Sequence, residues 1–266
     1  MATLTQPATA PAQPGTASAE PATASAEPGT ASVKPGTASV TRARIEQLMS
    51  RLTGDEKHTA AATSTLDVLH VLYSRILDVS PDRLDDPDRD RFYLSKGHGP
   101  MAYYATLAAH GYFPADWLDG FGAFGSPLGM HPDHLLIPGV EISSGSLGHG
   151  LPLAVGTAHA LAIRRSPARV IVLAGDAEMD EGSAIEAIEY AGAVGLEALT
   201  LVVIDNDSSS YAVRGRIEAR LAANGWDARR VDGRDHDELT DALARRVPGV
   251  PTAVVAQVER KYGAVA

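Results

Sequence analysis

The sequence predicts an α/β fold in which a parallel β-sheet is flanked by helices. Three short segments are rich in apolar residues, as the strands of a sheet buried on both faces are: residues 170–174, 199–204 and 252–258. Next to these segments, apolar residues recur at helical spacing over residues 183–194, 216–223 and 236–247. Because strands that alternate with helices are joined by crossover connections, we expect the strands to run parallel.

The segments before the first of these strands also carry helical patterns. Residues 41–52 are expected to form a short amphipathic helix. A second helix is marked by apolar residues at helical spacing, namely Leu66, Leu69, Leu72 and Ile76. Residues 78–90 are acidic and interrupted by proline, which predicts a solvated loop. We expect residues 41–266 to form one domain, since a chain of this length can bury its own core.

The first forty residues differ from the rest in composition. A seven-residue segment that starts at Pro14 recurs with small changes at Pro21, Pro28 and Pro35. Each copy carries a proline and none has large apolar residues at two seam positions, which argues against a coiled coil. We expect residues 1–40 to be a disordered tail, with a docking function as the alternative.

Composition excludes several classes of function. Among the 266 residues, acidic side chains outnumber basic ones, and the formal net charge of −10 argues against a protein that binds nucleic-acid phosphates. The absence of cysteine excludes disulfides, thiol catalysis and zinc–thiolate sites. No apolar run approaches the roughly 20 residues of a membrane span. The N-terminus also lacks the pattern of a signal peptide, so a cytoplasmic enzyme is expected.

Polar residues follow two of the predicted strands where each strand ends. Gly175 and Asp176 come directly after the strand at 170–174, and Asp205 and Asn206 come directly after the strand at 199–204. Ligands of parallel sheets bind at these carboxyl ends, and carboxylate and amide oxygens suit a hard cation such as Mg²⁺. A diphosphate would be stabilised by the helix that starts near Gly182. The alternative is that Asp176 caps a helix and Asn206 forms a turn.

This pattern resembles the signature of thiamine-diphosphate enzymes, in which Gly-Asp is followed by Asn after the next strand. The residues around it, 175–187, resemble the transketolase family in particular. Other segments resemble the same family in the same order: residues 90–99, 129–133, 138–141, 144–150, 232–235 and 251–258. Several motifs in register are more specific than any one of them. The resemblance covers the chain from residue 41 to its end.

The resemblance implies thiamine diphosphate and Mg²⁺ as cofactors. It makes the side chains of Asp176 and Asn206 ligands of Mg²⁺, and it adds the backbone carbonyl of Ser208. His98 would contact the diphosphate. The other implied cofactor-binding residues are Gly145, Ser146 and Leu147, which would lie against the aminopyrimidine ring, and Gly175, Ala177, Glu178 and Arg234. The implied catalytic residues are His58, His98 and His131, of which the first and last would contact the ketose.

Some residues depart from the family pattern on the substrate side. The glycines that surround the first histidine of the family are replaced in residues 57–62, and Ala177 and Met130 also replace glycines. Arg234 stands where the family has histidine, and an arginine binds phosphate in a bidentate manner. These departures suggest an unusual donor or acceptor.

The resemblance also implies a partner chain. The family activates the cofactor with a glutamate from a second, pyrimidine-binding domain, for which 266 residues leave no room. A second polypeptide is therefore expected to supply that domain in a two-plus-two heterotetramer. His149 follows the pattern of split-subunit members, and Glu181 and Glu186 match residues at the subunit contact.

The implied activity is transfer of a two-carbon ketol unit from a ketose donor to an acceptor. One alternative is a subunit that resembles pyruvate dehydrogenase and passes an acyl unit to a lipoyl or acyl carrier protein, and a hybrid of the two is conceivable. Another alternative is a non-catalytic scaffold that binds the cofactor or only keeps the fold.

Overall fold

The computed structural model describes residues 40–55, 58–209 and 213–260. The expected N-terminal tail lies outside the described residues, apart from Val40. Within the parts that are described, no helix is both long and apolar enough to cross a membrane.

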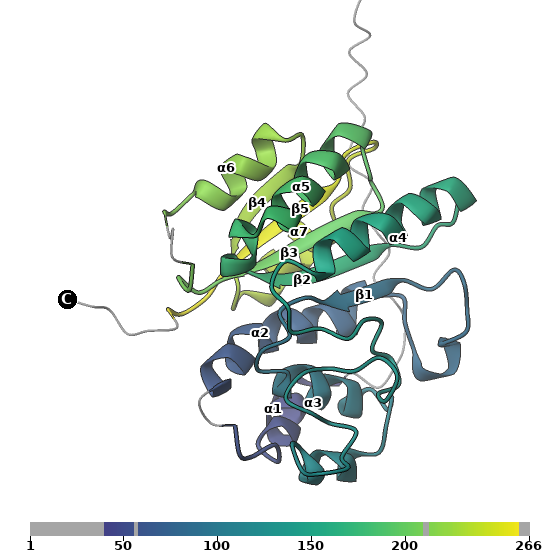
Figure 1. Cartoon of the computed structure of the whole chain (residues 1–266), viewed down its shortest axis with the longest axis vertical. Helices are drawn as coiled ribbons and strands as arrows, with labels where there is room; N and C mark the ends of the chain where they lie inside the picture. Colours follow the sequence, from purple (N-terminus) through teal and green to yellow (C-terminus); the bar gives the residue numbers. More distant parts are fainter. Residues whose placement is uncertain (1–39, 56–57, 210–212, 261–266) are drawn as a thin grey trace, which may run out of the picture.

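A five-stranded parallel sheet forms the centre of the protein, as the sequence predicts (Figure 1). The strands lie in the order β1-β2-β3-β5-β4. Their bounds are Arg91–Leu94 for β1, Val170–Gly175 for β2, Leu199–Asp205 for β3, Asp227–Asp232 for β4 and Thr252–Gln257 for β5. The three central strands are the three predicted apolar segments. The two edge strands, β1 and β4, were not expected.

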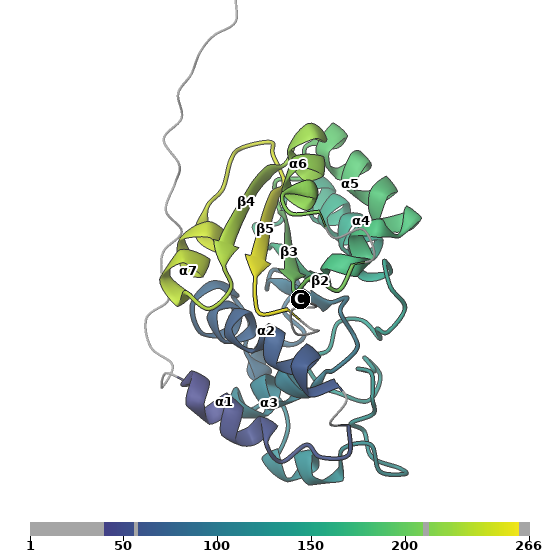
Figure 2. The ribbon, with the colours of Figure 1, turned by 90° about the vertical axis from the view of Figure 1, so that its left-hand side faces the viewer.

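Helices cover both faces of this sheet, in the order expected of a chain with crossover connections. Figure 2 shows α4, α5 and α6 on one side of the sheet and α7 with the layer of α1–α3 on the other. The helices are α1 (Arg42–Met49), α2 (Thr59–Val71), α3 (Met101–Ala109), α4 (Gly150–Arg164), α5 (Gly182–Val194), α6 (Arg216–Ala223) and α7 (His236–Ala244). After α2 the chain continues as a π-helical turn, Leu72–Ile76.

Alternate residues of the strands supply two hydrophobic cores. Ile171 and Leu173 of β2 pack with the core of α1–α3, while Val170 and Val172 pack with the core under α4 and α5. This alternation follows from the pleat of a strand, which points successive side chains to opposite faces. Both cores are continuous with the central strands, so the sheet is a rigid platform for the segments that leave its ends.

The segment at 78–90 is only partly the solvated loop that the sequence predicts. Its last residue, Asp90, is 3% exposed. The Asp90 carboxylate accepts hydrogen bonds from the backbone N–H of Asp78 at 2.8 Å and of Arg169 at 2.8 Å, and from Arg169 Nε at 3.1 Å. The prediction was wrong at this end because a buried carboxylate can be stabilised by donors distant in sequence, which a local pattern does not reveal.

Candidate functional site

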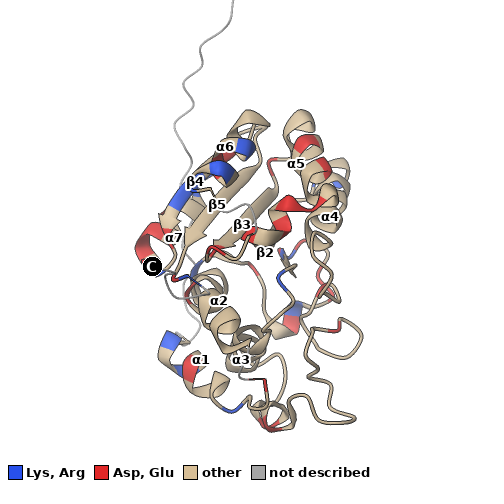
Figure 3. Cartoon of the chain, turned by 60° about the vertical axis from the view of Figure 1, so that its left-hand side comes forward, with Lys and Arg blue, Asp and Glu red and all other residues tan. Residues whose placement is uncertain are grey.

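The carboxyl ends of β1, β2 and β3 meet at one edge of the sheet. The chain leaves β2 at Gly175, which pairs with Ile204 near the end of β3. A 3₁₀-helix, Asp176–Asp180, follows β2 and leads to α5. Figure 3 shows acidic residues on this segment between β2 and α5, whereas basic residues lie on α6 and β4. This edge is where ligands bind in open parallel sheets.

Three histidines from distant parts of the chain lie together here. The ring centroids of His98 and His131 are 4.8 Å apart, with the rings nearly perpendicular at 88°. The ring centroids of His58 and His98 are 6.0 Å apart. His58 precedes α2, His98 follows β1, and His131 belongs to the irregular segment between α3 and α4. The structure therefore brings the three predicted catalytic histidines into one cluster, and their roles remain predictions.

Glycines make this cluster compact. A Cβ atom added at Gly97 would lie 2.6 Å from the backbone nitrogen of Gly145 and 2.8 Å from the hydroxyl of Ser144. Gly145 has a φ of +140°, and a Cβ there would lie 2.7 Å from the ring of His131. Both positions need glycine because backbone approaches backbone or ring directly. The predicted aminopyrimidine segment thus packs against the histidine cluster.

The carboxylate of Glu178 joins three segments of the site. Its Oε2 accepts a hydrogen bond from the backbone N–H of Gly175 at 2.8 Å. Its Oε1 accepts from Ser95 Oγ at 2.8 Å and from the backbone N–H of Gly148 at 3.2 Å. Ser95 Oγ in turn accepts from the backbone N–H of Gly150, the first residue of α4, at 3.0 Å. Burial raises the pKa of Glu178, and the three hydrogen bonds partly oppose that rise.

Glu178 therefore holds the ends of β1 and β2 and the start of α4 at fixed positions. This role is different from direct cofactor contact, which is what the resemblance implied for it. The structure shows the bracing contacts, and cofactor contact remains a prediction.

The predicted metal ligands follow two neighbouring strands, β2 and β3, and one of them has an oxygen without a hydrogen-bond partner in the described part of the chain. Asp176 and Asn206 are both 2% exposed. Within the described part of the chain, Asn206 Oδ1 is buried and has no hydrogen-bond partner. A buried polar atom without a partner is costly, so its persistence is explained if it binds a ligand absent from the protein alone. Mg²⁺ fits this oxygen-rich pair.

The loop after β3 also contacts Asp176. The Asp176 carboxylate accepts hydrogen bonds from the hydroxyl of Ser208 at 2.5 Å and from its backbone N–H at 2.6 Å. It also accepts one from the backbone N–H of Ser209 at 3.1 Å. Ser208 thus contacts Asp176 through its hydroxyl and its backbone N–H, whereas the prediction made its backbone carbonyl a ligand of Mg²⁺. No group of three or more histidine, aspartate or glutamate residues that could hold a metal occurs in the described ranges. A cation here would therefore take amide, backbone, water or ligand oxygens besides Asp176.

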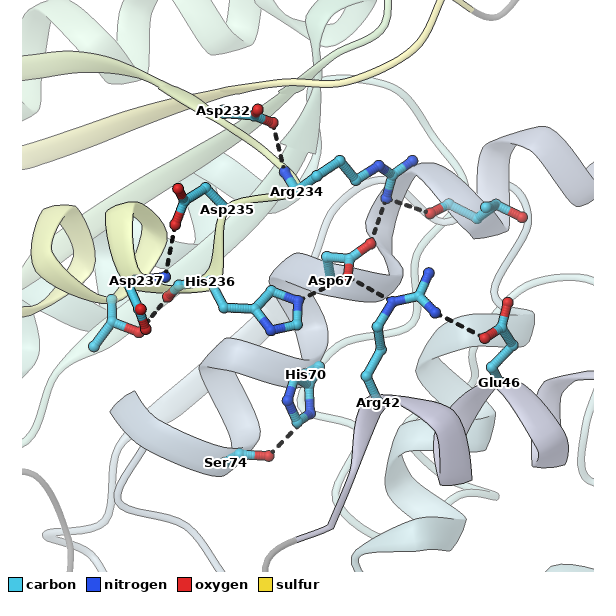
Figure 4. Close-up of polar contacts among 12 residues, drawn as sticks. Arg42, Glu46, Asp67, His70, Ser74, Asp232, Arg234, Asp235, His236 and Asp237 are labelled. Carbon is cyan, nitrogen blue, oxygen red and sulfur yellow. Dashed lines mark hydrogen bonds and ion pairs between the residues drawn. The ribbon is translucent and has the colours of Figure 1, made fainter.

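Arg234 lies in a polar network around the buried Asp67 (Figure 4). Its Nη1 donates to Asp67 Oδ2 at 2.7 Å and to the backbone carbonyl of Thr63 at 3.1 Å, and its Nε lies 3.0 Å from Glu259. Asp67 also accepts from Arg42 Nε at 2.6 Å and lies 2.8 Å from His236 Nε2. Arg234 is thus neutralised by two carboxylates, and its contact with a diphosphate remains a prediction.

The charges of this network shift the pKa values of two of the groups within it. Burial opposes ionisation of Asp67, but the hydrogen bonds from Arg42, His236 and Arg234 outweigh it and lower the pKa of Asp67 below its usual value. His70, whose ring centroid lies 5.1 Å from that of His236, has a pKa lowered to about 4, first by burial and then by the positive charges nearby. A cavity of about 520 Å³ borders Arg234 and Glu259 at the ends of β4 and β5.

The remaining predicted residues are spread around the cluster. Gly175 and Ala177 flank Asp176, and Ala177 donates its backbone N–H to the Asp176 carboxylate at 2.9 Å. Leu147 is 45% exposed, and Ser146 beside it is also exposed. The two residues expected at a contact between chains, Glu181 and Glu186, are also exposed, and so is His149.

Sequence reasoning missed several polar residues of the site. Asp55 contacts His58, Ser95 contacts Glu178, and Asp67 contacts Arg234. Only the first had a local signal, since an acid three residues before a histidine can reach it in a turn. Asp67 had none, because it lies within a helical pattern and its partners are far away in the sequence.

Comparisons with known proteins agree on one family. Residues 40–264 match the family model described as "Transketolase, thiamine diphosphate binding domain". The protein named Ferredoxin fas2 of Rhodococcoides fascians is 52% identical over 215 residues, covering 80% of this chain and 71% of that protein. One of the subunits of the apulose-4-phosphate transketolase of Actinobacillus succinogenes is 36% identical over 216 residues, covering 77% of each chain.

Solved structures are similar as well. A transketolase from Pichia stipitis in complex with sedoheptulose-7-phosphate has a TM-score of 0.71 and 26% sequence identity. The match covers 86% of this chain but only 37% of that one. The chain therefore spans little more than a third of the length of this solved transketolase.

Proposed function

Because the chain belongs to the transketolase family, through its thiamine diphosphate binding domain, we propose that it is one subunit of a two-chain enzyme that transfers a two-carbon ketol unit. The cofactors of this family are thiamine diphosphate and Mg²⁺. The observation that carries the proposal is the buried Asn206 Oδ1, without a partner among the described residues and beside Asp176, at the edge of the sheet where a diphosphate would lie.

The proposed roles are those that the resemblance implies, and they are compatible with where the residues lie. Asp176 and Asn206 hold Mg²⁺, with Ser208 contributing from the loop after β3. His98 contacts the diphosphate, and His58 and His131 orient the hydroxyls and carbonyl of the ketose beside it. When bound, thiamine diphosphate supplies the carbon nucleophile that cleaves the donor and carries the two-carbon unit to the acceptor.

Other residues of the chain hold the proposed metal ligands and histidines in position. Glu178 fixes the start of α4 against the ends of β1 and β2. The close contact of Gly97 with Gly145 keeps the aminopyrimidine segment against the histidines. A site whose parts are held in this way needs little reorganisation at the moment of reaction.

We also propose an obligate partner that supplies the pyrimidine-binding domain and its glutamate. The support is that the relative from Actinobacillus succinogenes is itself named as one subunit of a transketolase. A heterotetramer of two copies of each chain would place Glu181 and Glu186, both exposed, at the contact between copies.

The test is to capture the tagged full chain from its native extract with thiamine diphosphate and Mg²⁺, and then to assay the purified complex. We expect a second chain in equal amount, and transfer from a ketose phosphate to an aldose phosphate that needs both chains. Activity should be lost in Asn206→Ala and kept in the matched variant Asn224→Ala, whose side chain donates to the carbonyl of Arg220 in α6.

Three results would count against the proposal. Transfer of an acyl unit to a lipoyl or acyl carrier protein, with no transfer to an aldose phosphate, would favour the alternative acceptor. A chain that is captured alone and is as active without a partner would contradict the two-chain assembly. If cofactor binding persists without any transfer, the chain is a scaffold.

A further inference from the structure

A buried carboxylate is paired with a histidine of the proposed site. Both oxygens of Asp55 lie within hydrogen-bonding distance of His58 Nδ1, at 2.7 Å and 2.8 Å. The side chain of Asp55 is 3% exposed and that of His58 is 29% exposed. Neither the resemblance nor the roles proposed above assign a function to Asp55.

The backbone around this pair holds it in place. Gly54, with a φ of +96°, precedes Asp55, and the backbone N–H of His58 donates to the carbonyl of Asp55 at 2.9 Å. From the other side, Gly99 approaches so closely that an added Cβ would lie 3.0 Å from the carbonyl oxygen of His58. The backbone of His58 is therefore held by Asp55 on one side and by the segment after β1 on the other, which fixes the point from which the imidazole projects.

The pairing determines which nitrogen of the ring is free. An ionised carboxylate only accepts hydrogen bonds, so a neutral imidazole beside it carries its proton on Nδ1. His58 Nε2 is then left as an acceptor, in a ring whose neighbour in the cluster is His98, 6.0 Å away between centroids. An acceptor in this place suits a hydroxyl of a sugar.

We propose that Asp55 is a positioning residue that fixes the tautomer and orientation of His58, so that Nε2 accepts a hydrogen bond from a hydroxyl of the ketose donor. The inference rests on the proposed function, which places the donor beside the histidine cluster. A purely structural role is the competing explanation, since an acid before the first turn of α2 also stabilises the positive end of that helix. Helix stabilisation alone would not select a tautomer.

The tautomer can be measured without any activity. In the full chain labelled with ¹⁵N-histidine, at a pH of about 8.5 where histidine is ordinarily neutral, the nitrogen shifts should show His58 protonated on Nδ1. In Asp55→Ala the proton should move largely to Nε2. Asp55→Asn, whose carbonyl still accepts, should keep much of the Nδ1–H form and guards against an alanine variant that fails to fold.

Two controls accompany this measurement. Asp119→Ala removes a carboxylate that is 61% exposed and pairs with Arg51 near the same loop, and it should leave His58 unchanged. His134, whose Nδ1 lies 3.0 Å from Ser143 Oγ, should keep its shifts in every variant. A wild-type His58 protonated on Nε2, or a tautomer unaffected by Asp55→Ala, would overturn the inference.

The kinetic arm uses the purified two-chain complex. Loss of a hydrogen bond to a charged group should lower kcat/KM for the ketose about 10- to 100-fold in Asp55→Ala, chiefly through KM, with the affinity for thiamine diphosphate unchanged and partial rescue in Asp55→Asn. Unchanged kinetics despite an altered tautomer would overturn the positioning role. If wild type shows the Nδ1–H tautomer but no ketol transfer, the proposed function fails, and the assignment to a donor hydroxyl falls with it.

Discussion

Removal of the Glu178 carboxylate should loosen the site and destabilise the whole domain. In Glu178→Ala, the backbone N–H groups of Gly175 and Gly148 lose their acceptor within the core, while Ser95 can still rotate toward another partner. Each buried donor left without a partner costs about 1–3 kcal/mol. We therefore expect a loss of about 2–5 kcal/mol in the free energy of unfolding, and a fall of roughly 5–15 °C in Tm for a domain of this size.

Glu178→Gln, a neutral variant of the same shape, separates the effect of the hydrogen bonds of Glu178 from the effect of its charge. Because burial raises the pKa of Glu178, the native state favours its protonated form more than the unfolded chain does. The stability that the wild-type protein gains from this preference for the protonated form is fully present below the unfolded pKa of Glu178, and it is lost as the pH rises through the folded pKa. The stability deficit of Glu178→Gln relative to wild type should therefore narrow as the pH rises above about 4.3, the unfolded value for glutamate.

Urea unfolding of the full chain, followed by circular dichroism across that pH range, measures both effects. Glu189→Ala is the matched control, because it removes an exposed glutamate from α5, and it should change stability by less than about 0.5 kcal/mol. If Glu178→Ala unfolds at the same urea concentration as wild type, the hydrogen bonds of Glu178 do not brace the site and the reasoning is wrong.

Two further predictions concern the fold. The pKa of His70 is lowered to about 4, first by burial and then by His236. Its contribution to the free energy of unfolding is therefore present above about 6.5, the unfolded pKa, and is lost as the pH falls through the folded pKa. In His70→Gln the free energy of unfolding should fall less steeply with decreasing pH than in wild type, and an unchanged pH dependence would contradict this. Gly192→Ala would place a Cβ 1.7 Å from the carbonyl oxygen of Asn224 and should lower the free energy of unfolding by about 1–3 kcal/mol. Gly156→Ala, whose Cβ would meet nothing within 4 Å, should instead stabilise α4 by up to about 1 kcal/mol. Equal changes in Tm in the two variants would contradict the structure.

The sequence predicted the centre of the sheet but not its edges. The central strands β2, β3 and β5 are covered on both faces, so their apolar runs are conspicuous. The edge strands β1 and β4 read RFYL and DARRVD. Three residues of β1 are buried, but the strand is only four residues long, whereas β4 has one buried residue, Val231. Neither shows the longer apolar run of a strand that is buried on both faces, so composition alone does not reveal them.

Helix α3 was missed for the opposite reason. Eight of its nine residues are buried, and a helix that is apolar all round has no helical periodicity to detect. The helix α1, which has a polar face, was predicted within a few residues, and Thr41 caps it with a hydrogen bond from Arg44.

The candidate site was predicted where function leaves a local signature. Asp176 and Asn206 could be found because each follows an apolar strand directly. The contacts of Asp67 with Arg42, Arg234 and His236 join residues from distant segments, and only the fold brings them together. The place of single motifs at the ends of strands can thus be predicted from the sequence, whereas the network that holds them depends on tertiary packing.

The most direct test of the account is whether thiamine diphosphate binds this chain through a metal at Asn206. Calorimetric titration of the full chain with thiamine diphosphate should show binding in the presence of Mg²⁺, and this binding should be abolished by a chelator and in Asn206→Ala but retained in Asn224→Ala. Equal affinity with and without Mg²⁺, or in the Asn206→Ala variant, would contradict the metal-anchored cofactor site.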